Sequence, residues 1–336
     1  MRKKWGLASK ILAIVCLVAC GGPAVFAQAE GELTARRRLL PDVGPGLRAV
    51  KRGTDKRTYV LASPTPGLMV FDPQGKRELT IGGSPADPKA AAGPITFGED
   101  CDVDAEHRLY VADRGGNAVE VFSLDGALLR SMKVGAPVSV AALGEGEVAV
   151  ATLREPRLVI VFDKNGREVR DFGDPEQITD RTDLNRFLNA GQLITDAQGH
   201  LFYGFAYTPE PTVRQFDRNG YSTGPDIQYT ALEAAPEAQA VRREIQRQEK
   251  RQKAPTFKRV LTGTGVDRST GEIWMAVGNT LMRFDKEGNR RASYQIYTPE
   301  GARLEAKTIL VEPDKLIIGS DPLGLYEFDR PDKKIP

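Results

Sequence analysis

Cysteine is scarce in this sequence of 336 residues, which contains only three of them. Cys16 and Cys20 lie in an N-terminal segment that we interpret below as an export signal, which is removed or carries a lipid on Cys20. Cys101 therefore has no partner for an internal disulfide, and the fold depends on its hydrophobic core. Asp100 and Asp102 flank Cys101, and their charges disfavour the thiolate that a nucleophile needs. We therefore interpret Cys101 as a structural residue.

Histidine is scarcer still. His107 and His200 occupy corresponding turns of the repeat described below, so they do not converge on one site. A histidine zinc site and a Ser-His-Asp arrangement are therefore unsupported, and we predict no catalytic residue.

Acidic residues alternate at Asp100, Asp102 and Asp104, as at the start of an EF-hand calcium loop. Ala105 stands where that loop requires glycine, and Val111 stands where its closing glutamate belongs. The segment is better explained as a strand with acidic residues. We predict no metal ligand and no cofactor, with a divalent cation such as calcium as the alternative.

The net charge of +2 comes from the N-terminus. The chain has 47 Lys and Arg residues against 45 Asp and Glu, and the first 27 residues contain four basic residues and no acidic one. The remainder therefore has 43 basic and 45 acidic residues, a net charge of −2. A nearly neutral domain offers no electrostatic argument for nucleic-acid binding.

The first residues are typical of an export signal. A basic head precedes an apolar stretch at 11–19 that is too short to span a bilayer, and residues 25–27 form a small-x-small cleavage site. The tetrapeptide that ends at Cys20 also resembles a bacterial lipobox. Two alternatives follow: residues 1–27 are a signal peptide, or residues 1–19 are a lipoprotein signal and Cys20 carries a lipid. Both predict a periplasmic or extracellular protein, attached to a membrane only through such a lipid.

One phrase recurs six times along the chain. It consists of a residue followed by Phe, usually Asp, two variable residues and usually Gly, with Phe at positions 71, 122, 162, 216, 284 and 328. An apolar run precedes each copy, as in 59–62 and 273–276. Repeats of about 40 to 50 residues that contain several short strands are typical of β-propellers. We predict an all-β, six-bladed propeller over residues 33–336, with tight two-residue turns at Asn165-Gly166 and Asn219-Gly220.

Residues 102–122, DVDAEHRLYVADRGGNAVEVF, carry the clearest copy of the repeat. This segment resembles an NHL repeat, whose usual form is V-D-x-x-G-x-hydrophobic-Y-V-A-D-x-x-N-x-R-hydrophobic-x-V-F. Ala118 and Val119 stand where the family has Arg, and residues 195–202 are a weaker copy. The resemblance implies a six-bladed propeller of the bacterial exported type. Such propellers include binding scaffolds and a few enzymes, so the resemblance does not determine activity.

Closure of the ring involves the N-terminal segment. The chain ends just after the third strand of its last blade, so residues 33–40 are expected to supply the missing outer strand and remove an open sheet edge.

Three long connections are expected on one face of the disc, at 82–98, 174–189 and 231–256. Residues 231–256 are rich in helix formers and predict a helical insertion between the fourth and fifth blades, with Ala238, Val241 and Ile245 on its apolar side. A solvated helix that rests one turn on the propeller, a lid, and a docking site are the three interpretations. Residues 174–189 predict a shorter helical cap.

Candidate binding residues follow from position alone. Asp100, Gln192, Thr262 and Lys307 lie near the starts of inner strands, at the mouth of the central channel on the face with the long connections. Loops on that face add four candidates: Asp113, Asn117, Tyr207 and Glu210. Capping of the loop backbone is the alternative role for Asp113 and Asn117, and hairpin packing is the alternative for Tyr207, which we expect to be exposed.

We predict a non-catalytic binding or scaffold protein that engages a protein or small-molecule ligand at this face. The alternative is a metal-dependent hydrolase, lactonase or lyase on the same scaffold. In gluconolactonase-type propellers Glu, Asn and Asp on inner strands hold a divalent metal; Asp100 fits such a role, but matching Glu and Asn residues are missing. Assembly on a cell-surface complex through the helical insertion is a third interpretation.

Overall fold

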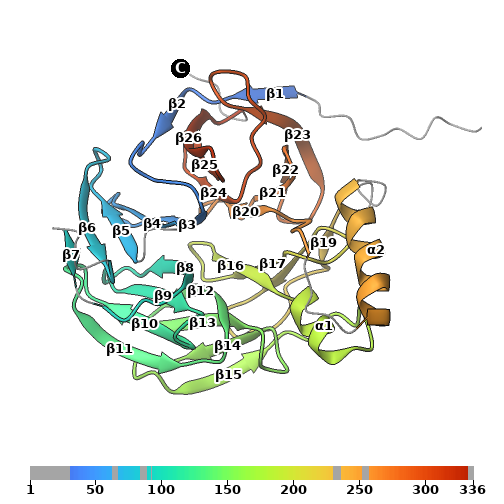
Figure 1. Ribbon diagram of the computed structural model, residues 1–336, viewed down its shortest axis with the longest axis horizontal. Coiled ribbons are helices and arrows are strands. Elements are labelled where there is room, and N and C mark those ends of the chain that lie inside the picture. Colours follow the sequence, from blue (N-terminus) through green and yellow to red (C-terminus); the bar gives the residue numbers. More distant parts are fainter. Residues whose placement is uncertain are drawn as a thin grey trace, which may run out of the picture.

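A computed structural model describes residues 31–62, 67–83, 89–91, 93–229, 236–251 and 257–331. In these ranges the strands form six sheets arranged around a central axis, as the blades of a propeller (Figure 1). The predicted fold class is therefore confirmed.

Each blade consists of antiparallel strands that follow one another in the chain. The first contains β3 (Leu47–Arg52), β4 (Thr58–Ala62), β5 (Leu68–Phe71) and β6 (Arg77–Ile81), with β7 (Ala90–Ala91) added parallel to β6. The second contains β8 (Gly98–Val103), β9 (Leu109–Asp113), β10 (Ala118–Phe122) and β11 (Leu128–Lys133). The third contains β12 (Pro137–Gly144), β13 (Glu147–Thr152), β14 (Val159–Phe162) and β15 (Glu168–Phe172).

The other three blades keep this plan. The fourth contains β16 (Gly191–Thr195), β17 (Leu201–Phe205), β18 (Thr212–Phe216) and β19 (Ile227–Gln228). The fifth contains β20 (Gly263–Val266), β21 (Ile273–Val277), β22 (Thr280–Phe284) and β23 (Arg290–Tyr297). The sixth contains β24 (Thr308–Val311), β25 (Lys315–Ser320) and β26 (Gly324–Asp329).

The hydrophobic core lies between neighbouring blades. Each of the six interfaces has its own cluster of buried side chains, and the cluster that joins the sixth blade to the first contains Ile317, Leu325, Val60 and Phe71. The Phe of the repeated phrase is buried in every copy. Because each sheet is covered on both faces, its middle strands are apolar throughout instead of alternating.

The phrase ends in a turn held by its Asp. In the third blade, Asp163 Oδ1 accepts hydrogen bonds from the amides of Asn165 at 2.8 Å and Arg167 at 2.9 Å, and only Gly166 has a positive φ, at 76°. The predicted two-residue turn is therefore wrong here. The Asx hydrogen bonds favour a longer turn, with Gly in the left-handed position and an irregular register in the strand before it.

The N-terminal segment closes the ring, but it serves two blades rather than one. β2 (Arg37–Leu39) pairs antiparallel with β26 and completes the sixth blade, as predicted. β1 (Gly31–Thr34) instead pairs parallel with β23 and extends the fifth blade. Ala35 and Arg36 bridge the two, since their amides donate to the carbonyls of Tyr297 and Glu327.

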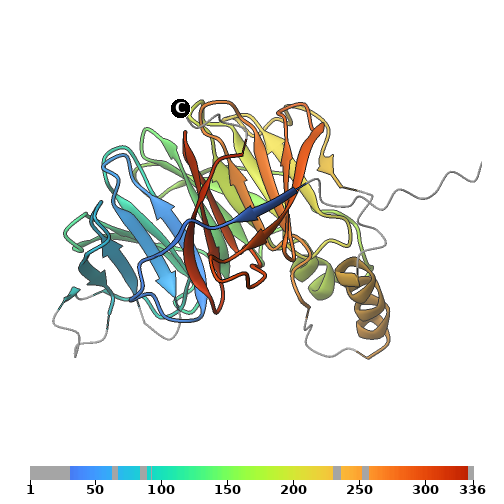
Figure 2. The ribbon, with the colours of Figure 1, turned by 90° about the horizontal axis from the view of Figure 1, so that it is seen from above.

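The expected helices lie on one face of the disc (Figure 2). α1 (Thr182–Leu188) precedes β16, and α2 (Pro236–Arg251) follows β19 and precedes β20, hence between the fourth and fifth blades. Ala238, Val241 and Ile245 are buried as predicted, but α2 packs on α1 through Leu184 and Leu188 over several turns. The interpretation of α2 as a helix resting by one turn is therefore wrong. Neither described helix is long and apolar enough to cross a membrane.

Candidate functional site

The inner strands enclose a cavity of about 730 Å³ on the axis of the propeller. Its apolar wall is formed by side chains of the first, fourth, fifth and sixth blades: Val50, Ile194, Val266, Ile309, Leu310 and Val311. Its polar groups include Lys51, Asp102, Gln192, Thr195 and Arg268. A cavity of this size with apolar walls and a few converging polar groups is typical of a small-molecule site.

Glycines bring the inner strands of the fifth and sixth blades together beside this cavity. A Cβ on Gly265 would lie 2.8 Å from the carbonyl oxygen of Ile309, and one on Gly263 would lie 3.0 Å from that of Ala306. Because backbone atoms cannot move aside easily, larger residues at either position would force β20 and β24 apart.

The cavity opens on the face opposite the helices. Its rim consists of turns between the first and second strands of the blades, including Gly53, Ser269 and Pro313. A second cavity, of about 60 Å³, lies at the starts of the inner strands, on the side of α1 and α2. Gln192 and Thr264 line both cavities, which are therefore neighbours along one channel. The wide end faces away from the long connections that we expected to carry the site.

Several charges at the wide end are already paired. Arg52 Nη1 lies 3.0 Å from Glu312 Oε1, and Lys315 Nζ lies 3.8 Å from Glu312 and 3.1 Å from Glu327. Asp267 receives a 2.6 Å hydrogen bond from Arg330. Arg52, Glu312, Lys315 and Asp267 line the cavity, and these ion pairs already satisfy their charges.

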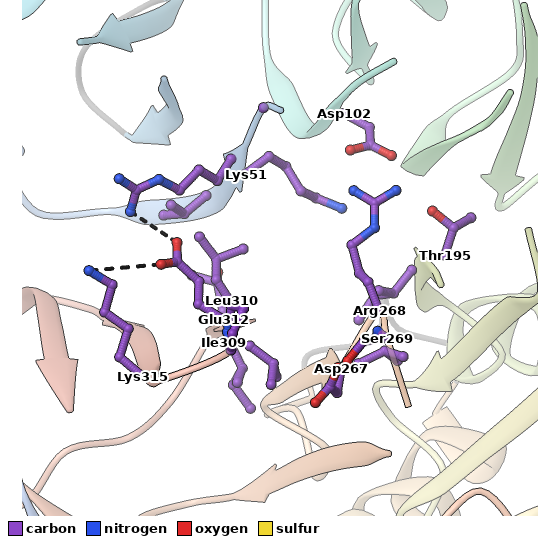
Figure 3. A pocket seen from close by; sticks show the side chains of 18 of the residues that line it. Lys51, Asp102, Thr195, Asp267, Arg268, Ser269, Ile309, Leu310, Glu312 and Lys315 are labelled. Carbon is purple, nitrogen blue, oxygen red and sulfur yellow. Dashed lines mark hydrogen bonds and ion pairs between the residues drawn. The ribbon is translucent and has the colours of Figure 1, made fainter. Parts of the chain in front are cut away.

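Lys51, from β3 of the first blade, and Arg268, which follows β20 of the fifth blade, extend toward each other in the cavity, with Asp102 beside the guanidinium (Figure 3). Burial lowers the pKa of Lys51, but the carboxylates of Asp102 and Asp100 raise it by more, so the pKa of Lys51 lies above its ordinary value. Its ammonium is therefore charged at neutral pH. Arg268 opposes this rise in the pKa, as a nearby like charge must.

Asp100 lies at the narrow end and is buried in β8. Its carboxylate accepts hydrogen bonds from the Ser139 hydroxyl, from the amide of Val140 at 3.3 Å and from its neighbour Cys101 at 2.9 Å. Burial raises the pKa of Asp100, although Lys51 opposes the rise. Asp100 therefore joins the second blade to the third more than it faces the channel.

Cys101 is free and buried, and burial raises the pKa of its thiol well above the usual value. This agrees with a structural role. The two histidines lie in first turns, as expected, and His200 Nδ1 lies 2.7 Å from Asp196 Oδ2 outside the channel. In the described ranges no three His, Cys, Asp or Glu side chains come together to hold a metal ion.

The candidates predicted from the sequence do not form one site. Gln192, Asp100 and Tyr207 line the narrow cavity. Lys307 is paired with Asp321 at 2.8 Å, and the Thr262 hydroxyl donates to the Ala276 carbonyl at 3.1 Å. Of the candidates near the starts of inner strands, some therefore line the channel, whereas others bond to neighbouring residues within its wall.

The loop candidates have structural contacts. Asp113 accepts hydrogen bonds from the amides of Thr96 and Phe97 at 2.8 and 2.7 Å, and Asn117 accepts one from Ala136 at 3.0 Å. Both therefore cap backbone, but in the connections between blades rather than in their own loop.

Tyr207 and Glu210 contact the helices. The ring of Tyr207 packs on Phe187 with centroids 4.7 Å apart and is partly buried rather than exposed. Glu210 forms an ion pair with Arg242 of α2. These two residues attach the helix pair to the fourth blade.

Lys51 and Arg268 were missed in the sequence because candidates were counted from the starts of inner strands. Lys51 is the fifth of six residues in β3, and Arg268 lies two residues after β20. The same counting applied to the ends of inner strands would have found both.

No protein-family model matches this chain, and no curated protein matches it in sequence. Solved structures resemble it in fold. A streptogramin B lyase superposes with a TM-score of 0.56 at 11% identity over 88% of this chain and 87% of the other. A virginiamycin B lyase from Staphylococcus aureus with quinupristin gives 0.53 at 10% identity over 88% and 89%. Regucalcin from Agrobacterium tumefaciens, a calcium-binding protein, gives 0.56 at 12% over 89% and 95%. At these identities the likeness extends to the propeller fold alone.

Proposed function

We propose that this protein is an exported, non-catalytic binding protein that holds a small organic molecule in the central channel of its propeller. The observation that carries the proposal is the cavity of about 730 Å³, which has apolar walls and a small group of polar side chains at the ends of inner strands. The ligand enters from the face that carries the turns between the first and second strands of the blades.

This location differs from the face that the loop lengths favoured. The helices there pack on each other and on the fourth blade through Tyr207 and Glu210, and the channel is narrow at that end. The wide mouth lacks such a cover among the described residues. We therefore place the ligand there, and nucleic acid has no part in this function.

The alternative is a metal-dependent hydrolase, lactonase or lyase; the names of two structural neighbours record lyase activity for those proteins. In the described part of the chain this alternative lacks a set of metal ligands. Metal analysis of the purified protein separates the two: stoichiometric calcium or zinc would favour the enzyme.

A tryptophan placed in the channel tests the proposal. Gln192 on β16 lines both cavities, whereas Gln228 on β19, the outermost strand of the same blade, is exposed to solvent. Gln192→Trp fills the channel, and Gln228→Trp is the matched control. Both variants and the parent are screened against one panel of small metabolites by thermal shift.

We expect that at least one compound stabilises the parent and Gln228→Trp but not Gln192→Trp. Binding that survives in Gln192→Trp would place the ligand elsewhere. A panel with no hit, together with a protein partner recovered by crosslinking through α1 or α2, would favour the scaffold function instead.

A further inference from the structure

Three cations line the wide cavity without forming an ion pair within 4.0 Å to a described residue: Lys51, Arg268 and, in an exposed turn at the rim, Lys56. Three further cations of this region are paired: Arg52 with Glu312, Lys315 with Glu312 and Glu327, and Arg330 with Asp267. Among the described residues, neither Lys51 nor Arg268 makes a side-chain hydrogen bond or an ion pair within 4.0 Å, although both face the middle of the cavity (Figure 3).

Two like charges that face each other across a cavity repel, and the repulsion strengthens as water is displaced. We infer that the ligand carries an anionic group, a carboxylate or a phosphate, which lies between the ammonium of Lys51 and the guanidinium of Arg268. The guanidinium presents a planar pair of N–H donors that matches both groups, and Lys51 adds a positive charge from the first blade. This inference rests on the proposed function and names the class of ligand.

Asp100 and Asp102 both lie close enough to Lys51 to raise its pKa. Asp100 is held at the narrow end by hydrogen bonds from Ser139 and Val140. Asp102 lies beside the Arg268 guanidinium (Figure 3). Its Oδ2 accepts a hydrogen bond from the amide of Ala142 at 2.9 Å, which holds the carboxylate at the wall formed by the second and third blades. Asp102 remains an acceptor, so the ligand carries a hydroxyl or amino donor next to its anionic group.

The apolar wall limits the rest of the ligand. Ile309, Leu310 and Val266 line the same cavity and offer no hydrogen bonds from their side chains. The structure thus favours a small organic acid or phosphate ester with a hydroxyl group and a compact carbon skeleton over a free inorganic anion.

The test uses the full mature chain and probes that differ in one group at a time. Citrate and tricarballylate differ only in a hydroxyl, glycerol 3-phosphate and glycerol differ in the phosphate, and inorganic phosphate represents the anion alone. Binding is measured by calorimetry at constant ionic strength, so that general screening does not vary.

The variants are Lys51→Gln and Arg268→Gln, and the controls are Lys133→Gln and Arg167→Gln. The controls remove the same charge from exposed positions outside the cavity, on β11 and in the turn before β15. Arg268 is itself exposed, so Arg268→Gln is expected to fold even if Lys51→Gln does not.

We expect citrate or glycerol 3-phosphate to bind the parent and both controls. We expect Lys51→Gln and Arg268→Gln each to weaken that binding about 10-fold or more, the usual effect of a lost charge-assisted hydrogen bond. We also expect weaker binding of tricarballylate, glycerol and inorganic phosphate.

Equal binding of the anions to the variants and the controls would overturn the inference. So would the absence of any anion binding to the parent. A neutral compound that binds the parent, tolerates both substitutions and is blocked by Gln192→Trp would overturn the anionic class and leave the channel as the binding site.

Discussion

Arg330 Nη1 lies 2.6 Å from Asp267 Oδ2 and joins the end of the sixth blade to the first turn of the fifth. Its Nη2 lies 3.1 Å from Glu272 Oε2, and its Nη1 also donates to the carbonyl of Glu312 at 3.1 Å. The Arg330 side chain is 1% exposed and that of Asp267 is 7% exposed. This buried group fixes the turn that carries Arg268 into the channel.

Replacement of Arg330 by methionine should destabilise the fold. Removal of one partner from a buried ion pair leaves an uncompensated charge and typically costs about 3 kcal/mol. Arg36→Met is the control, since its pair with Asp329 is exposed and should contribute less than about 1 kcal/mol. Urea unfolding of both variants measures the difference. Equal losses would show that burial of Arg330 does not matter.

Acid should weaken the same contact. Burial raises the pKa of Asp267, but hydrogen bonds from Ser269 and Arg330 lower it by more, from its ordinary value of 3.8 to about 2. Because the folded-state pKa lies below the unfolded value, this stabilisation is present above pH 3.8 and is lost as the pH falls toward 2.

Urea unfolding at pH 7 and at pH 2 to 4 tests this dependence. The parent should be more stable than Asp267→Asn at neutral pH, and the two should converge as the pH approaches about 2. A constant difference over this range would mean that ionisation of Asp267 does not contribute.

Deletion of residues 31–40 should expose the edges of β26 and β23 together. We expect the Tm to fall by about 10 °C or more, or soluble protein to be lost, since about 1 kcal/mol corresponds to about 2–4 °C in large domains. A chain that begins at Ala35 keeps β2 and lacks only β1, so its loss should be smaller. A full deletion as stable as the parent would refute the role of this segment in closure.

Replacement of residues 236–251 by a Gly-Ser linker should lower the free energy of unfolding by more than it would if α2 were only a solvated helix. Leu184 and Leu188 are fully buried in the cluster that α2 completes, and their exposure should cost about 3 kcal/mol. Arg242→Gln, which removes only the ion pair with Glu210, should have little effect. Urea unfolding measures both. Unchanged stability after the replacement would show that α2 is dispensable.

The N-terminal alternatives can be separated at Cys20, which lies outside the described residues. If Cys20 is lipidated, the protein should partition with membranes, and Cys20→Ala should release it or block its maturation. Mass spectrometry of the mature N-terminus gives the second readout. An unmodified N-terminus at Gln28 would establish plain secretion.

Most of the fold follows from local sequence. The phrase around Phe71, Phe122 and its other copies marks the third strand of each blade, because a blade is a run of antiparallel strands joined by short turns. Its hydrogen bonds join residues that are close in the chain, so the pattern of apolar runs and Gly turns is sufficient to predict it. The helix at 236–251 and its buried face follow from composition in the same way.

The site was predicted less well, since it combines residues far apart in the chain. Gln192 and Asp100 were found from strand position, yet Lys307 at an equivalent position is bound to Asp321 instead of facing the channel. A partner of this kind cannot be seen from spacing, because contacts between blades depend on how the sheets twist against one another.

The sequence by itself determined six blades, the order of their strands and the position of both helices, since these depend on periodicity within about 50 residues. Only the tertiary structure decided that residues 31–39 serve two blades and that the wide end of the channel opens away from the helices. It also brought Lys51 and Arg268 together across more than 200 residues of chain. The two side chains come from the first and fifth blades, so their approach depends on closure of the ring and not on their spacing along the chain.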